Sequence, residues 1–124
     1  MTAVTEDATL ERRRIRAARS QAMFREVNER IVELSKSWSA EPQFVCECES
    51  TDCAETITLT TDEYEAVRSD PGSFVVALGH NVPAVEETVY STDRYLVVRK
   101  LGEGHDLAVE FDPRKADSDG HLRG

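Results

Sequence analysis

Residues 8 to 37 contain neither proline nor glycine, the two residues that most often end a helix. Within them, apolar residues follow steps of three and four and so share one helical stripe: Phe24, Val27, Ile31, Leu34 and Trp38. Followed backward, the stripe continues through Ser20, Ala17, Arg13 and Leu10, so it weakens toward the N-terminus. We expect one long helix that packs along its C-terminal half, where the stripe serves core packing or a dimer seam.

Charge is distributed unevenly along the chain. Residues 11–30 hold seven arginines and three glutamates, a net +4, so the remainder of a chain of net −9 carries −13. A basic segment on an acidic body either docks on its own fold or reaches an acidic partner. The overall negative charge argues against general nucleic-acid binding. We expect a basic N-terminal arm over 1–22, partly mobile, one domain over 23–111 and a disordered tail over 112–124.

The rest of the chain predicts short strands and one short helix. Residues 39–43, with Pro42, end the long helix, and strands are expected at 44–48, 57–59 and 74–78. Thr60 and Glu63 form a capping box, and Leu59 with Tyr64 a hydrophobic staple, which predicts a helix over 61–69. Residues 88–90 and 95–101 favour a hairpin, although a short helix from Pro83 is an alternative. Residues 105–111 form an element of uncertain type, after a turn at Gly102 and Gly104.

All three cysteines fall within eight residues, as Cys46, Cys48 and Cys53. Side chains two apart in a strand point to one face, so Cys46 and Cys48 can aim at one point, and the following loop can return Cys53 to it. A tetrahedral zinc site needs a fourth ligand. His80, after Gly79 at the end of a buried strand, is the natural candidate. We therefore predict a Cys3His zinc site.

Other interpretations of these residues stay open. His105 and His121 are weaker candidates for the fourth ligand. The thiols can instead be inert buried hydrophobes or take part in redox chemistry. The surrounding carboxylates are interpreted as a solvated acidic loop: Glu47, Glu49, Asp52 and Glu55. Four aromatic side chains are expected in the core: Tyr64, Phe74, Tyr90 and Tyr95.

A further set of segments is distinctive when taken together: Met23 to Ile31, Phe44 to Cys48 with Cys53, Leu59-Thr60, Glu63 to Glu65, Val67-Arg68, Pro71, Phe74 to Val76, Gly79-His80, Pro83, Tyr95 to Val98 and Asp112 to Arg114. In these segments the chain resembles a group of small uncharacterised actinobacterial proteins. Leu78 stands where that family usually has a proline before Gly-His. The resemblance covers about residues 16 to 114 and implies an intracellular, metal-binding protein, with no established activity.

These observations lead to one set of expectations. The fold class is α+β, with the long N-terminal helix, a small mainly antiparallel sheet carrying the zinc site, and one short helix. The absence of apolar runs and of a secretory signal favours the cytoplasm and no membrane contact. No catalytic motif is found. We expect a zinc-stabilised interaction or regulatory module without catalytic activity, which meets a protein partner or itself through the N-terminal helix. The alternatives are a nucleic-acid or ribosome-associated factor and a thiol-based redox sensor.

Overall fold

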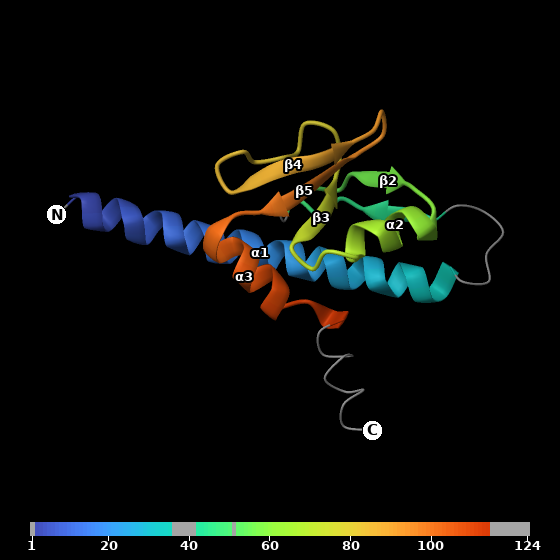
Figure 1. Ribbon diagram of the computed structural model, residues 1–124, viewed down its shortest axis with the longest axis horizontal. Helices are drawn as coiled ribbons and strands as arrows, with labels where there is room; N and C mark the ends of the chain where they lie inside the picture. The colour runs from blue at the N-terminus through green and yellow to red at the C-terminus, as the bar shows by residue number, and fades with distance from the viewer. Residues whose placement is uncertain (1, 36–41, 51, 115–124) are drawn as a thin grey trace, which may run out of the picture.

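The computed structural model describes residues 2–35, 42–50 and 52–114, and its fold is α+β, as expected. The order of elements is α1 (Thr2–Ser35), β1 (Gln43–Val45), β2 (Thr56–Thr58), α2 (Thr61–Arg68), β3 (Ser73–Val76), β4 (Glu86–Ser91), β5 (Leu96–Lys100) and α3 (Gly102–Glu110). Helix α1 runs beneath the strands, with α3 beside it and reaching below it, and the N-terminal part of α1 extends past the other elements (Figure 1). No helix among the described residues is both long and apolar enough to cross a membrane.

Two small antiparallel sheets lie above α1. One pairs β1 with β2, with Phe44 opposite Ile57, and the other has the strand order β3-β5-β4. The sheets are joined where the chain leaves β1, because the Glu47 N–H donates to the Val75 carbonyl of β3 at 2.8 Å. The first sheet thereby covers the β3 edge of the second, while β4 forms the other edge.

The core lies between these sheets, α2 and α1. Phe44 stacks on Tyr64 with ring centroids 4.6 Å apart, and Phe74, Val75 and Val98 are fully buried beside them. Three of the four aromatic residues expected in the core are there. Tyr90 is 59% exposed, so that expectation is wrong for it. Its strand β4 is an edge strand, and from Glu87 to Ser91 every side chain is exposed.

The predicted start of α2 is confirmed in detail. The Thr60 hydroxyl accepts from the Glu63 N–H at 3.0 Å, and the Glu63 carboxylate accepts from the Thr60 N–H at 2.8 Å. Both residues of the staple, Leu59 and Tyr64, are fully buried. A capping box of this kind satisfies two of the donors that a helix N-terminus leaves without partners.

The open choices after Pro83 are resolved by hydrogen bonding. Residues 86–91 are a strand paired with β5, with a bulge between Thr88 and Tyr90, so the alternative of a helix from Pro83 is wrong. The element of uncertain type is α3, which begins at Gly102. Gly104 therefore lies inside a helix rather than in a turn. It is buried because α3 packs closely there: a side chain at this position would come within 3.3 Å of the Lys100 stem.

The face that α1 buries differs from the apolar stripe. Val27 and Leu34 of the stripe are exposed and Phe24 and Ile31 half-buried, while Trp38 lies outside the described residues. The buried face is instead largely polar and consists of Ala17, Ala18, Gln21, Arg25, Asn28, Val32 and Ser35. These polar side chains satisfy groups that the sheets leave open. Asn28, for example, accepts from the Val45 N–H at 2.8 Å and donates to the Val45 carbonyl at 2.9 Å.

The limits of the domain also differ from those expected at 23 and 112. Helix α1 begins at Thr2 rather than near residue 8, and it already packs on the body at Ala17, Ala18 and Gln21, inside the expected arm. At the other end, Asp112 is buried and bonded to Arg68, so residues 112–114 belong to the folded body. The rest of the expected tail, 115–124, lies outside the described residues, as do most of the residues expected to end α1.

Candidate metal centre

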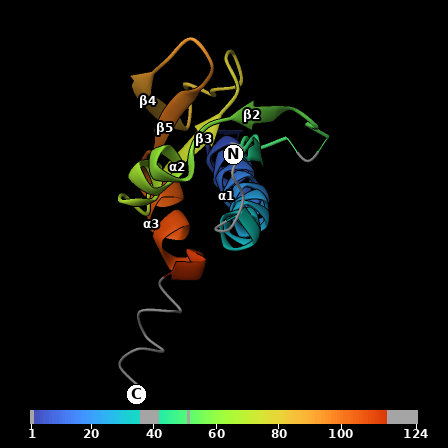
Figure 2. The ribbon, with the colours of Figure 1, turned by 90° about the vertical axis from the view of Figure 1, so that its right-hand side faces the viewer.

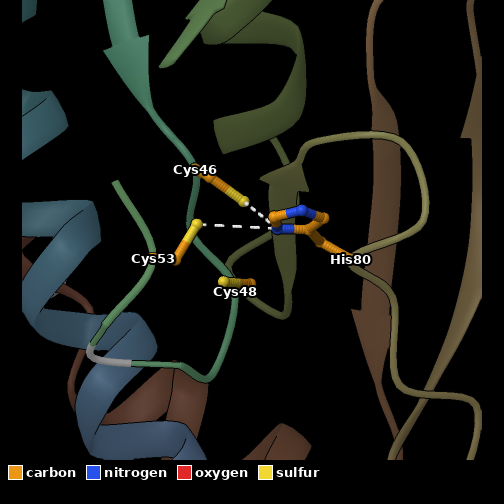
Figure 3. A group of neighbouring side chains, drawn as sticks. All are labelled: Cys46, Cys48, Cys53 and His80. Atoms are coloured by element: carbon orange, nitrogen blue, oxygen red, sulfur yellow. Dashed lines mark hydrogen bonds between the residues drawn. The ribbon is translucent and has the colours of Figure 1, made fainter. Parts of the chain in front are cut away.

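Two connections, the one between β1 and β2 and the one after β3, bring the cysteines and His80 together. Cys46 directly follows β1, where its N–H donates to the Glu55 carbonyl at 3.0 Å and so continues the pairing of β1 with β2. Cys48 and Cys53 belong to the loop between these strands. His80 lies in the turn after β3, the strand that Glu47 joins to this loop. Figure 3 shows the three thiols gathered around the imidazole ring.

The distances within this group suit a tetrahedral ion. The four ligand atoms lie within 4.8 Å of one another, and His80 Nδ1 is 3.6 Å from Cys46 Sγ and 3.5 Å from Cys53 Sγ. A zinc ion with Zn–S bonds of about 2.3 Å and a Zn–N bond of about 2.0 Å sets sulfur and nitrogen about 3.5 Å apart. The four residues singled out from the sequence therefore come together in a group able to bind a metal ion.

Of the other two histidines, His105 takes no part in this group and His121 cannot be placed in relation to it. His105 lies in α3, with Nε2 at 3.2 Å from the Arg99 guanidinium, and His121 is outside the described residues. The turn that carries His80 explains its placement. Gly79 has φ +81°, a conformation that side chains disfavour, and the His80 N–H donates back to the Ala77 carbonyl at 3.0 Å. The turn reverses the chain and sets the imidazole over the thiols.

Burial raises the pKa of a cysteine thiol, whereas a bound cation would lower it. Cys46 and Cys48 are buried, and this burial raises the pKa of both thiols above the ordinary value. The Ala77 N–H donates to Cys46 Sγ at 3.2 Å and works against that rise, because it stabilises the thiolate. A bound metal ion deprotonates its cysteine ligands outright. The backbone donor is thus placed to support a metal-bound sulfur.

Glu47, between the first two cysteines, is a structural centre that the sequence interpretation missed. Its carboxylate is fully buried and accepts from Tyr64 Oη at 2.6 Å, Asn28 Nδ2 at 2.9 Å and the Val75 N–H at 3.0 Å. It thereby ties the cysteine segment to α1, α2 and β3. Alternation along the segment already puts residue 47 on the face opposite to its cysteine neighbours. That signal was available, but the other acidic residues nearby favoured a solvated loop.

The remaining carboxylates near the cluster fit that expectation better. Asp52 and Glu55 are exposed, while Glu49 is half-buried and paired with Arg13 of α1 at 3.2 Å. No carboxylate belongs to the described group of ligand atoms, which consists of three sulfurs and one nitrogen. Such a set suits a borderline-soft ion, whereas hard ions such as Mg²⁺ and Ca²⁺ prefer oxygen.

Comparison with family models, with curated proteins and with solved structures finds no match to this chain. The resemblance to actinobacterial proteins therefore stays a prediction. What can be said of function depends on the geometry of the four residues and on the surfaces around them.

Proposed function

We propose that Cys46, Cys48, Cys53 and His80 hold one zinc ion that stabilises the fold. The observation that carries the proposal is the clustering of four zinc-type ligand atoms within 4.8 Å. Strands β1 and β2 have three residues each, too little for an independent sheet. An ion bridging the loop after β1 and the turn after β3 would strengthen the junction of the two sheets that Glu47 and Val75 already make. An iron–sulfur cluster is less suitable, because a fourth thiolate is missing.

The proposed role of the ion is structural. Four protein ligands complete a tetrahedral shell, whereas catalytic zinc sites keep one position for water or substrate. We therefore propose that the protein is not an enzyme and acts through contacts with other macromolecules, as a small regulatory or interaction module. Three thiols kept reduced for metal binding suit the cytoplasm. Helix α1 is the proposed contact element, because it extends past the body (Figure 1) and exposes apolar residues.

The metal content of the purified protein tests the site directly. Protein prepared without chelator and without a nickel affinity step should contain close to one zinc per chain by elemental analysis. Cys48→Ser and His80→Ala should lose zinc and melt at a lower temperature, because metal binding is coupled to folding in such sites. His105→Ala is the matched control and should keep its zinc. Wild-type protein free of metal, with a melting temperature unchanged by chelator, would exclude the proposal.

A second candidate function rests on the arginines of α1. Arg12, Arg13, Arg16 and Arg19 are exposed on α1, although Arg13 is paired with Glu49 of the body, so a nucleic acid is an alternative partner. The acidic remainder of the chain, at −13, opposes it. Binding that weakens steeply with salt would identify contacts with phosphate, since counterions are released there.

A further inference from the structure

The side of α1 that faces away from the body carries an apolar row. Met23, Val27 and Leu34 are 47%, 42% and 65% exposed, and Ser20 and Arg30 continue the row at the same spacing of three and four residues. The polar side chains that α1 buries, such as Gln21 and Asn28, lie on the other side. Figure 2 looks along the helix and shows the sheets and α3 gathered on one part of its circumference. The apolar row is therefore a surface that the described chain leaves open.

A row of charges runs beside the apolar row, and its sign changes halfway along. Arg12, Arg19, Glu26 and Glu33 are spaced seven residues apart, so they share one flank of the helix, and all four are exposed. The two basic residues lie toward the N-terminus and the two acidic residues toward the C-terminus. When one helix is turned end to end against another, the basic residues of this row face acidic residues. In an antiparallel two-fold pair the same flank of both helices meets across the seam, so this row places opposite charges together, whereas a parallel two-fold pair sets the row against the other flank of the partner helix.

We propose that the partner of α1 is a second copy of this chain, packed antiparallel along the apolar row in a two-fold symmetric dimer. The inference deepens the proposed function, since it names the partner of the module, and it does not depend on the metal ion. A two-fold interface uses the same patch on both subunits and needs a patch that is complementary to itself. The charge row of α1 meets that requirement.

The charges also specify the register. Arg12 meets Glu33 of the second copy, and Arg19 meets Glu26, when the two residue numbers sum to 45. The two-fold axis then passes between residues 22 and 23, so the two copies of Met23 lie beside it, and Val27 is level with residue 18 of the other helix, within one turn of Ser20. Small and large side chains thus face one another across the seam. Arg16 comes near Arg30 of the second copy, a like-charge contact that the neighbouring glutamates offset.

The extended part of α1 gains a role in this arrangement. A helix of 34 residues is about 51 Å long. The half that extends past its own body would lie along the C-terminal half of the other α1, beneath the second body. The two bodies would be on opposite sides of the helix pair, because each is attached to the face of α1 remote from the apolar row.

Sedimentation equilibrium of the zinc-loaded full chain tests the proposal. The wild type should reach twice the chain mass of 13.9 kDa at concentrations up to about 100 µM. Val27→Lys places a charge in the apolar seam and should raise the dissociation constant about tenfold or more. Val89→Lys is the matched control: Val89 is 50% exposed on β4, away from α1, and its substitution should leave the dimer intact. At concentrations low enough for every sample to be monomeric, both variants should melt at the same temperature as the wild type.

Charge reversal tests the antiparallel register. Arg19→Glu and Glu26→Arg should each weaken the dimer, since each sets like charges against one another, and the double variant should restore it. Failure of the double variant to recover would overturn the antiparallel arrangement. A wild type that stays monomeric, or a dimer indifferent to Val27→Lys, would overturn the proposal. Zinc is measured in the same samples, so a monomer with one zinc per chain contradicts this inference alone, whereas a dimer without zinc contradicts only the metal site.

Discussion

Glu47 shows how one residue can determine the position of a neighbouring site. Its side chain accepts three hydrogen bonds from three different elements, and its backbone N–H joins β3. Cys46 and Cys48 are attached to either side of this anchor. A buried carboxylate is tolerated only when donors surround it. Here those donors come from α1, α2 and β3, so the position of the cysteine segment depends on the packing of all three elements.

Replacement of Glu47 should be among the most destabilising substitutions in the chain. Glu47→Ala leaves the Tyr64 hydroxyl, the Asn28 amide and the Val75 N–H buried without this acceptor. We expect a loss of about 3 kcal/mol or more in the free energy of unfolding, since each unsatisfied buried donor costs about 1–3 kcal/mol. Glu49→Ala, at the half-exposed Arg13 pair, should cost about 1 kcal/mol or less. Urea denaturation of both variants measures this, and equal losses would contradict the role of Glu47.

Glu29 makes stability depend on pH. It accepts from Arg68 Nε at 2.9 Å and from Arg114 Nε at 2.6 Å. Burial by itself raises the pKa of this carboxyl, but the hydrogen bonds from Arg114 and Arg68 outweigh burial, and the pKa lies below its ordinary value of 4.5. Because the pKa of Glu29 is lower in the folded state than in the unfolded state, this carboxylate stabilises the protein at pH values above its unfolded pKa. That contribution decreases as the pH falls below 4.5 and is lost once the pH passes the folded value.

The Glu29→Gln variant isolates this effect. At neutral pH it should unfold more easily than the wild type, and the difference should shrink below pH 4.5. Urea denaturation at a series of pH values, at one protein concentration, makes the comparison, and Glu103→Gln on the exposed start of α3 is the control. A difference between wild type and Glu29→Gln that stays constant down to pH 3 would show that the carboxylate charge is not responsible.

Helix α1 is the element whose two halves have different environments. From Ala17 onward it is packed on the body, whereas residues 9–16 lie before the packed segment. Hydrogen exchange of backbone amides should therefore be slow from about residue 21 through Val32. The range begins at residue 21 because its N–H donates to the carbonyl of Ala17, where the packed segment begins. In the dimer, residues 12–20 should also be protected, because they lie on the second copy.

The dimer-breaking variant separates these two sources of protection along α1. Val27→Lys should restore fast exchange over residues 12–16 and leave residues 25–32 slow, since the contacts of Arg25 and Asn28 with the body are unchanged. Exchange is measured by mass spectrometry on peptides from both halves. Equal protection of both halves in a chain shown to be monomeric would contradict this description of α1.

The charge of the whole molecule governs its behaviour toward nucleic acid. Seven arginines lie between residues 11 and 30, but the rest of the chain carries −13. Repulsion acts over about 8 Å at physiological salt. We predict no retention of RNA or duplex DNA at physiological salt. Filter binding tests this with the wild type and with a variant in which five arginines become glutamine: Arg12, Arg13, Arg14, Arg16 and Arg19. Salt-sensitive retention by the wild type alone would favour nucleic acid as the partner.

The sequence by itself determined the local structure of this protein. The capping box at Thr60, the alternation around Phe44, the turn at Gly79 and the clustering of the cysteines all depend on neighbours within a few residues. Such patterns predicted α2, most strands and the four residues of the candidate metal centre. The positions of the element boundaries were less well predicted: α1 begins earlier than expected, and the start of α3 has no side-chain cap that could have indicated it.

Only the tertiary structure decided which face of α1 is buried. Periodicity identifies the apolar stripe of a helix, but it contains no information about what the rest of the chain needs from that helix. Here β1 needs partners for the Val45 backbone, and Glu47 needs donors, and Asn28 supplies both. Leaving these buried polar groups unpaired would cost more free energy than burying the exposed valine and leucine of α1 would gain. The polar face of α1 therefore turns inward, and the apolar row remains outside.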